Sequence, residues 1–389
     1  MRQSVLNREQ QKILELLKEI DIICKKNKIP YFLSPYLTFC AVMKRPFPQN
    51  PSAGVVYMKT GDMERFKNIF EEEPELRRTL ESMENNSRFP GFFLRYTDKD
   101  TLLYRMDEYG KYRYPGISVT ILPLQCEYGP KLKYHWNRMR EEGWKRIYGK
   151  KGTWRNRREL ACIWMVRFLS LCGRGWLGKS IFRDLLHQPQ ENVRTYVIRY
   201  FEMNLYFSAS VFERTQEIEL EGERFSIPED VEKYLVTAYG KKYRNKSPEK
   251  YVPDSMSVCS ALIPCEEFMQ QSKELKKFAA DRKRVVRRRK FGLNYRKYFE
   301  QCWDYVKFCG AKCECSAAYR KKQSYIQNLL KNEDYVQLEK TFAEYTRMMN
   351  RCLKYEEAFD TDPEIFELYL QYLEKTGRIS YMEKVKKYV

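Results

Sequence analysis

Apolar and polar positions alternate along the first seventy residues with periods that predict helix, strand, helix, strand and helix in turn. The segment over residues 8–28 has its apolar residues at three- and four-residue spacing, typical of an amphipathic helix: Ile13, Leu16, Leu17, Ile20 and Ile23. Pro30 ends this helix, and "YFLSPYLTFCAVMK" predicts a short strand leading into a second element. The short apolar run "AGVVYM" at Ala53–Met58 predicts a buried strand, and "MERFKNIF" returns to helical spacing. This order predicts an α/β or α+β opening.

The pattern changes twice further along the chain. "FFLRYT", "TLLYRMD" and "GISVTILPL" predict strands, whereas "RRELACIWMVRFLSL" and "ENVRTYVIRYFEMNLYF" in residues 131–210 suggest helices. "EIELEGERFSIPEDVEKYLVTAYGKKY" predicts a hairpin that turns at Glu221 and Gly222 and stops at Pro228, then a helix over Asp230–Tyr239. Beyond residue 265 the pattern is helical, and its last two helices meet at residues 376–378. We therefore expect one domain over residues 1–265 and a helical extension over 266–389.

Composition limits the classes of protein that fit. The 389 residues are 43% hydrophobic, enough for a core, and carry a net charge of +20, which favours anionic partners. No apolar leader follows the first residues, and the most apolar segment, Leu160–Cys172, contains Arg167 and reaches about half a membrane span. We expect no transmembrane helix, a cytoplasmic location, peripheral at the inner membrane face in one alternative, and twelve reduced cysteines.

Few residues offer familiar catalytic chemistry. The two histidines, His135 and His187, lie in no recognisable catalytic motif. The run "CGAKCEC" with Cys309, Cys313 and Cys315 lacks a clear fourth zinc ligand, so zinc is disfavoured there but left open. The basic run "DRKRVVRRRK" at residues 281–290 could bind an anionic polymer, an acidic membrane surface or RNA. A solvated helix face is the favoured interpretation of that run, and nucleic acid is not the expected partner.

The stretch "CGRGWLGKSI" matches the phosphate-binding pattern G-x-x-x-x-G-K-S through Gly173, Gly178, Lys179 and Ser180. A working phosphate loop follows a buried strand and needs a second strand that ends in aspartate. Here the preceding stretch from Arg158 to Cys172 predicts a helix with its apolar residues at helical spacing: Leu160, Ile163, Trp164, Phe168 and Leu171. We therefore expect an accidental match, with Gly173 to Lys179 forming a turn between two helices and Lys179 exposed.

Three ordered blocks resemble the LicD family, which also includes fukutin-like proteins. The first block is "LKEIDIICKKNKIPYFLSPYLTFCAVMKRPF", and the second is "TDKDTLLYRMDEYGKYRYPGISVTILPL". The third is "FERTQEIELEGERFSIPEDVEKYLVTAYGKKY", so the resemblance covers roughly residues 8–265. It implies an α+β fold, a nucleotidyltransferase-like mixed sheet flanked by helices, to which this chain adds an all-helical C-terminal extension. It also implies transfer of phosphocholine or a polyol phosphate from an activated nucleotide to a glycan or teichoic acid.

The chain departs from the family pattern where the chemistry requires specific residues. The family's Gly-Gly-Thr phosphate turn is here Pro35, Tyr36 and Leu37. Its magnesium-binding aspartates correspond to residues without a carboxylate: Ala53, Val55, Thr120 and Gln125. Lys44 and Arg45 stand where the family has Arg-His-Lys, which implies residual contacts to an anion. Because Mg²⁺ needs carboxylate ligands to bind and orient phosphates, we expect no magnesium and no metal-dependent transfer.

Three functions stay open at this point. The favoured hypothesis is a pseudo-transferase that works through binding, with a LicD-like transferase or a glycan-assembly protein as its partner in surface-polymer decoration. The alternative is an active, divergent transferase that recruits Asp98, Asp100 or Asp107, although "YTDKDT" is also typical of a solvated turn between strands. The third is RNA binding through the basic run. The family resemblance leaves the enzymatic activity undecided.

Overall fold

The structure is a computed structural model that forms two compact units. Unit 1 comprises Met1–Lys99 and Leu103–Cys259, and unit 2 comprises Asp100–Leu102 and Ser260–Val389. Described residues are 6–72, 77–86, 89, 91–105, 116–127, 131–148, 157–188, 193–200, 203–245, 257–270, 295–355, 359 and 361–386.

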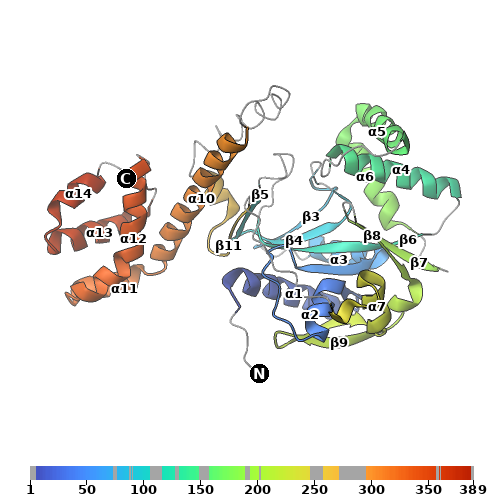
Figure 1. The fold of residues 1–389 in the computed structure, drawn as a ribbon, viewed down its shortest axis with the longest axis horizontal. Helices are drawn as coiled ribbons and strands as arrows, with labels where there is room; N and C mark the ends of the chain where they lie inside the picture. The colour runs from blue at the N-terminus through green and yellow to red at the C-terminus, as the bar shows by residue number, and fades with distance from the viewer. Residues whose placement is uncertain are drawn as a thin grey trace. The chain divides into compact units, whose positions relative to one another are not determined.

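A mixed seven-stranded sheet forms the centre of unit 1, with β1, β2, β6, β4 and β3 in that order and β7 and β8 continuing from the end of β6 (Figure 1). Strands β2 and β6 are parallel, and the other pairs are antiparallel. The bounds are β1 Phe32–Leu33, β2 Val55–Lys59, β3 Arg78–Glu81, β4 Leu94–Asp98, β6 Ser118–Cys126, β7 Thr195–Tyr200 and β8 Met203–Ser208. Strands β5 (Leu102–Arg105) and β11 (Ser257–Ser260) pair separately.

Helices α1 (Arg8–Lys26) and α3 (Thr60–Glu72) cover one face of this sheet. A capping box starts α1: Gln10 N donates to Asn7 Oδ1 at 2.8 Å, and Asn7 N donates to Gln10 Oε1 at 2.9 Å. Gly54 lets α1 approach the sheet closely, because a Cβ there would lie 2.8 Å from Ile13 Cγ2 and 3.0 Å from Val119 Cγ2. Val119 therefore faces α1, and alternation along β6 turns Thr120 to the opposite face.

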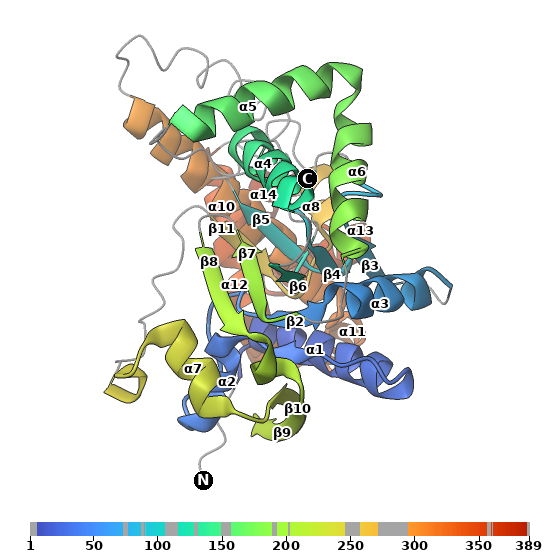
Figure 2. The ribbon, with the colours of Figure 1, turned by 90° about the vertical axis from the view of Figure 1, so that its right-hand side faces the viewer.

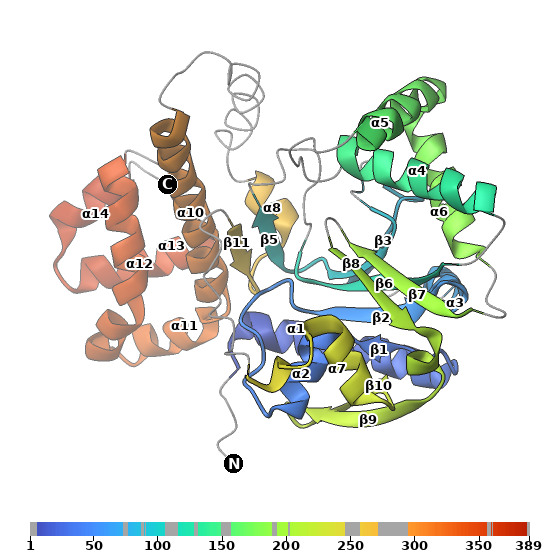
Figure 3. The ribbon, with the colours of Figure 1, turned by 45° about the vertical axis from the view of Figure 1, so that its right-hand side comes forward.

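Three helices leave the sheet after β6 and return to it at β7. They are α4 (Lys131–Tyr148), α5 (Arg157–Leu169) and α6 (Arg174–Leu186), with the short helix η1 (Ser170–Cys172) between the last two. Figures 1 and 3 show these helices together beside one end of the sheet. Gly143 brings α4 against α5, since a Cβ there would lie 2.4 Å from the carbonyl oxygen of Cys162. The helix predicted for Arg158–Cys172 is confirmed.

The helical interpretation of "ENVRTYVIRYFEMNLYF" is wrong, because this segment forms the antiparallel hairpin β7–β8. Aromatic and β-branched side chains favour a pleated strand, and pairing of Gln125 with Val197 joins β7 to β6. Figure 2 shows β7 and β8 side by side. Tertiary pairing therefore outweighs the helix-like spacing of the apolar residues.

The predicted hairpin and helix of the third sequence block are confirmed. Strands β9 (Thr215–Leu220) and β10 (Glu223–Pro228) pair in register around Glu221 and Gly222. Asp230 caps the helix α7 (Val231–Tyr239) by accepting a hydrogen bond from Lys233 N at 2.9 Å. Helix α2 (Pro35–Val42) contacts both β9 and α7. Phe39 of α2 packs against Tyr239 of α7, with ring centres 5.6 Å apart.

Unit 2 is mainly helical, so the α+β class with a helical C-terminal region is confirmed. Phe342, fully buried, packs against the rings of Tyr345, Tyr369 and Tyr372 with centroid distances of 5.9, 5.0 and 5.2 Å. Its helices are α8 (Cys265–Gln270), α10 (Tyr295–Arg320), α11 (Gln323–Lys331), α12 (Tyr335–Tyr355), α13 (Pro363–Lys375) and α14 (Ile379–Val385). The predicted joint at residues 376–378 lies between α13 and α14.

Candidate functional site

The phosphate-loop pattern lies in a helix, contrary to the predicted turn. Gly173, with φ of +119°, separates η1 from α6, which begins at the next residue. Leu177 N donates to Gly173 O at 3.1 Å, so this amide is engaged within the helix. Gly178 is a packing residue: a Cβ there would lie 2.6 Å from Met83 Sδ and 2.8 Å from Trp144 Cη2. Lys179 is exposed, as expected, but on α6.

Gly178→Val is expected to lower the free energy of unfolding by about 1–3 kcal/mol, because its side chain overpacks the contact with Met83 and Trp144. The matched variant Lys179→Ala should change that free energy by less than about 0.5 kcal/mol, because Lys179 is exposed. Chemical denaturation measures both values. A phosphate loop would instead make Lys179→Ala abolish micromolar ATP binding in calorimetry.

The start of α2 meets β2 and β6 at a point that we call the β2–β6 junction: Ser34, Ala53, Gly54, Val55 and Thr120. Ser34 N donates to Val55 O at 3.0 Å, and Thr120 N donates to Gly54 O at 2.8 Å. Val55 and Thr120 are register partners on the parallel strands. The fold therefore brings together three of the predicted family positions, Ala53, Val55 and Thr120, from distant parts of the sequence.

The predicted turn at Pro35, Tyr36 and Leu37 is the first turn of α2. Ser34 caps the helix, and its Oγ accepts a hydrogen bond from Leu37 N at 3.4 Å. Pro35 has no N–H, and Leu37 is fully buried. Neither position can therefore donate a backbone hydrogen bond to a phosphate: Pro35 has no N–H, and the N–H of Leu37 is already bonded to Ser34.

A buried arginine lies next to the junction. Arg95 on β4 is the register partner of Thr120 and has no exposed surface. Its guanidinium lies 5.5 Å from the ring centre of Phe89 and 5.6 Å from that of Phe93. Arg95 offers no oxygen to a metal ion, because a guanidinium carries only N–H donors. Sequence reasoning missed Arg95, although an arginine inside the apolar run "FFLRYT" was the available signal.

Lys44 and Arg45 do not lie at the start of α2. They follow its last residue, Val42, so the length of an eight-residue helix, about 12 Å, separates them from Ser34. The guanidinium of Arg45 lies 4.5 Å from the ring centre of Phe39, and Lys44 is exposed with φ of +49°. The two cations predicted to contact an anion are thus outside the β2–β6 junction.

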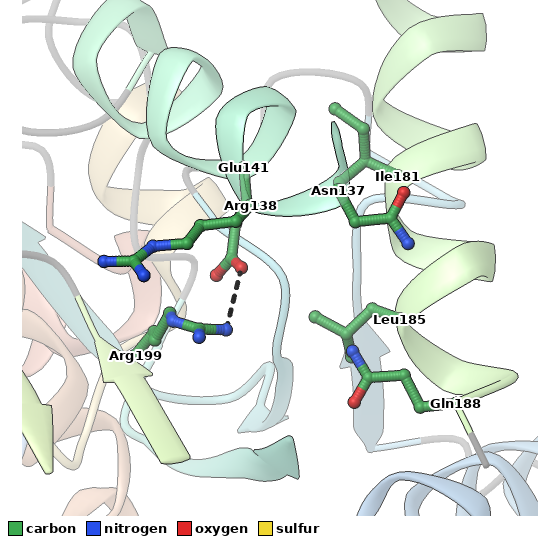
Figure 4. A pocket seen from close by; sticks show the side chains of 7 residues that line it. All are labelled: Asn137, Arg138, Glu141, Ile181, Leu185, Gln188 and Arg199. Carbon is green, nitrogen blue, oxygen red and sulfur yellow. Dashed lines mark ion pairs between the residues drawn. The ribbon is translucent and has the colours of Figure 1, made fainter. Parts of the chain in front are cut away.

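Gln125 lies in a separate polar network towards the end of β6. Its Nε2 donates to Glu141 Oε1 at 3.3 Å, and Arg199 donates to its Oε1. Arg199 Nη1 is 3.6 Å from Glu141 Oε2, and Figure 4 shows these two side chains pointing toward one another. The adjoining hollow has a volume of about 20 Å³, room for about one water. Because Gln125 is five residues from Thr120, strand alternation places the two on opposite faces.

Asp98 is not the solvated turn residue that its sequence context indicates. It is 1% exposed at the end of β4, with Oδ2 at 2.8 Å from Arg78 Nη1 and at 3.2 Å from Lys12 Nζ. These partners place it on the α1 face, opposite Thr120. Asp100 is exposed, and Asp107 lies outside the described residues. Of the acids proposed for a divergent active site, Asp98 is therefore held away from the β2–β6 junction.

The remaining candidates from the sequence are the cysteines near residue 310 and the basic run. Cys309 and Cys313 are buried within α10, and burial raises the pKa of the Cys315 thiol to about 12, so it holds its proton at neutral pH. Within the described part of the chain, no three His, Cys, Asp or Glu side chains are grouped to hold a metal ion. The basic run at residues 281–290 lies outside the described residues.

A cleft of about 360 Å³ opens at the other end of β2, beside Lys59. Lys25, Lys28 and Lys59 line it together with apolar and polar side chains. Lys25 already pairs with Asp21 at 3.0 Å and with Glu217 at 2.9 Å, which reduces the charge available to an anion. The remaining lining residues are Cys24, Ile29, Pro30, Tyr31, Phe32, Phe212, Glu213, Thr215 and Ser226.

Comparisons with protein families, curated proteins and solved structures found no match. Among the helices that the structure describes, none has the length and apolar character needed to cross a membrane. Because no relative was found, a functional proposal has to start from the side chains of the β2–β6 junction and from the sequence.

Proposed function

We propose that this chain is a LicD-like protein of nucleotidyltransferase fold that has lost metal-dependent transfer and acts by binding. Its role is in the decoration of cell-surface glycans or teichoic acids with phosphocholine or a polyol phosphate. Its partner in this proposal is a carboxylate-bearing transferase or another glycan-assembly protein. The fold name, the pathway and the partner all derive from the family resemblance.

The observation that carries the proposal is the composition of the β2–β6 junction. Ala53, Val55 and Thr120 meet there, and none has a carboxylate. Magnesium catalysis of phosphoryl transfer requires carboxylate oxygens to hold the metal between phosphates. Arg95, the register partner of Thr120, also offers no oxygen ligand. The positions that correspond to the family's metal ligands thus lie close together, but their side chains offer no carboxylate to a metal ion.

The active alternative has less support. It needs an acid near the junction, and Asp98, one of the two described candidates, is engaged by Arg78 and Lys12 on the α1 face. Freeing that carboxylate would break a buried ion pair, which is costly. A binding role requires no such rearrangement.

Millimolar Mg²⁺ or Mn²⁺ is expected to leave the melting temperature unchanged, because Ala53, Val55 and Thr120 offer no carboxylate. A metal that binds only the folded state would stabilise it by RT ln(1 + [M]/Kd), about 2.7 kcal/mol at a hundredfold excess over Kd. Differential scanning fluorimetry with and without EDTA measures this shift. A reproducible rise that Asp100→Asn abolishes would instead support the divergent enzyme.

The function itself is tested in two assays on the full chain. Incubation with nucleotide-activated choline or polyol phosphate and a glycan acceptor should give no transfer above the buffer rate. Addition of the intact LicD-type transferase from the same genome should give a complex with that enzyme in size-exclusion chromatography. Transfer by the chain alone would contradict the inactive assignment, and absence of the complex would contradict the partner role.

A further inference from the structure

Helices α5, η1 and α6 present large apolar side chains to solvent. The exposed fractions are 63% for Trp164, 73% for Phe168, 81% for Leu171 and 63% for Trp176. The first three follow i, i+4, i+7 spacing and form one stripe. Trp176 lies near the turn that ends this stripe, because a Cβ on Gly173 would be 3.9 Å from Trp176 Cβ. Exposed apolar patches of this kind mark interaction sites.

Other side chains of these helices form their buried face. Among the side chains of α5 that the structure describes, Cys162, Ile163 and Val166 are buried, and a Cβ on Gly143 of α4 would lie 2.6 Å from Val166 Cγ2. On α6 the buried face includes Leu177 and Phe182. The predicted apolar face of α5 was therefore wrong in part: Ile163 packs inward, whereas Trp164, Phe168 and Leu171 point outward.

Positive charge borders the stripe. Arg167 lies three residues from Trp164 on α5, and Lys179 and Arg183 lie three and seven residues from Trp176 on α6. All three are exposed, and none forms an ion pair with a described residue. The sequence from residue 160 to residue 183 contains no Asp or Glu. This surface is therefore both apolar and cationic.

We propose that this surface docks on a lipid bilayer with anionic headgroups. We call it the aromatic-basic face: Trp164, Arg167, Phe168, Leu171, Trp176, Lys179 and Arg183. Amphipathic helices bind such membranes by burying apolar side chains at the headgroup boundary while Lys and Arg contact lipid phosphates. Tryptophan suits this boundary because its ring is apolar and its N–H remains near water. An anionic bilayer thus offers an apolar layer for the exposed apolar side chains and negative charge for the basic ones.

The full chain is tested by sedimentation with phosphatidylcholine vesicles, with or without about 30% phosphatidylglycerol. It should bind the anionic vesicles and release them as salt rises, because charge attraction is screened. Binding only to neutral vesicles, or none to either, would overturn the proposal.

Two triple variants divide the face into its components. Trp164→Ser, Phe168→Ser, Trp176→Ser should weaken binding at least about tenfold by removing buried apolar area. Arg167→Gln, Lys179→Gln, Arg183→Gln should weaken it by about 100-fold, from about 1 kcal/mol for each basic residue near an anionic surface. Both variants should keep the wild-type melting temperature, since all six side chains are exposed.

Matched controls remove the same features elsewhere on the chain. Ile22→Ser, Val336→Ser, Ile379→Ser replaces three other exposed apolar side chains, and Lys340→Gln, Lys375→Gln, Lys384→Gln gives the same net charge as the basic variant. Both controls should bind anionic vesicles as the wild type does. Equal losses in controls and face variants would overturn the proposal. So would a solution dimer that the aromatic variant dissociates, or binding of RNA at high salt, if the vesicles stay unbound.

Discussion

Arg78→Met is expected to lower the free energy of unfolding of unit 1 by about 3–5 kcal/mol. The Arg78 side chain is 6% exposed and contacts Asp98, Glu15 and Glu19, with Nη2 at 2.6 Å from Glu19 Oε1. Hydrogen bonding to Glu19 raises the pKa of Arg78, so the guanidinium stays charged. Its removal takes one ion-pair partner from the 1% exposed carboxylate of Asp98, which also pairs with Lys12.

Guanidinium denaturation followed by tryptophan fluorescence measures this loss, because five of the six tryptophans lie between residues 136 and 176 in unit 1. Arg214→Met is the matched control. Arg214 is 80% exposed and pairs with the exposed Glu229 at 3.8 Å, so its replacement should cost less than about 0.5 kcal/mol. Equal, small losses for both variants would show that the Arg78 pairs contribute little.

Phe342→Ala should destabilise unit 2 by about 3–5 kcal/mol. Phe342 is fully buried and stacks on Tyr319 at 5.9 Å, besides its contacts with the tyrosines of α12 and α13. Alanine removes these ring contacts and leaves a cavity that rigid neighbouring rings fill poorly. Circular dichroism at 222 nm and hydrogen exchange in α12 and α13 measure the loss.

The control for this variant is Val336→Ala on the same helix. Val336 is 69% exposed, so the change should be less than about 0.5 kcal/mol. Phe342→Leu should lose less stability than Phe342→Ala, since most of the volume remains. A small, equal effect of all three variants would contradict the importance of this aromatic cluster.

Local signals predicted several elements closely. Glu221 and Gly222 both have positive φ, of 52° and 84°, as a two-residue hairpin turn with this twist requires. Asp230 accepts the hydrogen bond that starts α7. Such features depend on neighbouring residues, so the sequence contains the information needed to predict them.

Features that depend on distant partners could not be predicted in the same way. Asp98 is buried because Arg78 and Lys12 come from other elements, and its own neighbours indicate only a polar turn. Thr195–Tyr200 becomes a strand because β6 offers it a pairing edge, and Met203–Ser208 then pairs with Thr195–Tyr200. The contact between Val55 and Thr120 follows from the parallel register of β2 and β6, whereas Gln125 lies five residues further along β6 and pairs with Val197 of β7. The sequence shows which residue types occupy the candidate site, but it does not predict which of them lie close together in the fold.

The excursion that carries α4, α5 and α6 begins and ends at paired positions of neighbouring strands. Cys126 is the register partner of Tyr196, and Glu127 N donates to Thr195 O at 3.1 Å. A short hairpin turn could join β6 to β7 at the same place, so the backbone path of the sheet does not require the helices. The segment from β6 to β7 therefore has the topology of a domain insertion. Such a segment can be gained or lost without a change in the pairing of the strands around it.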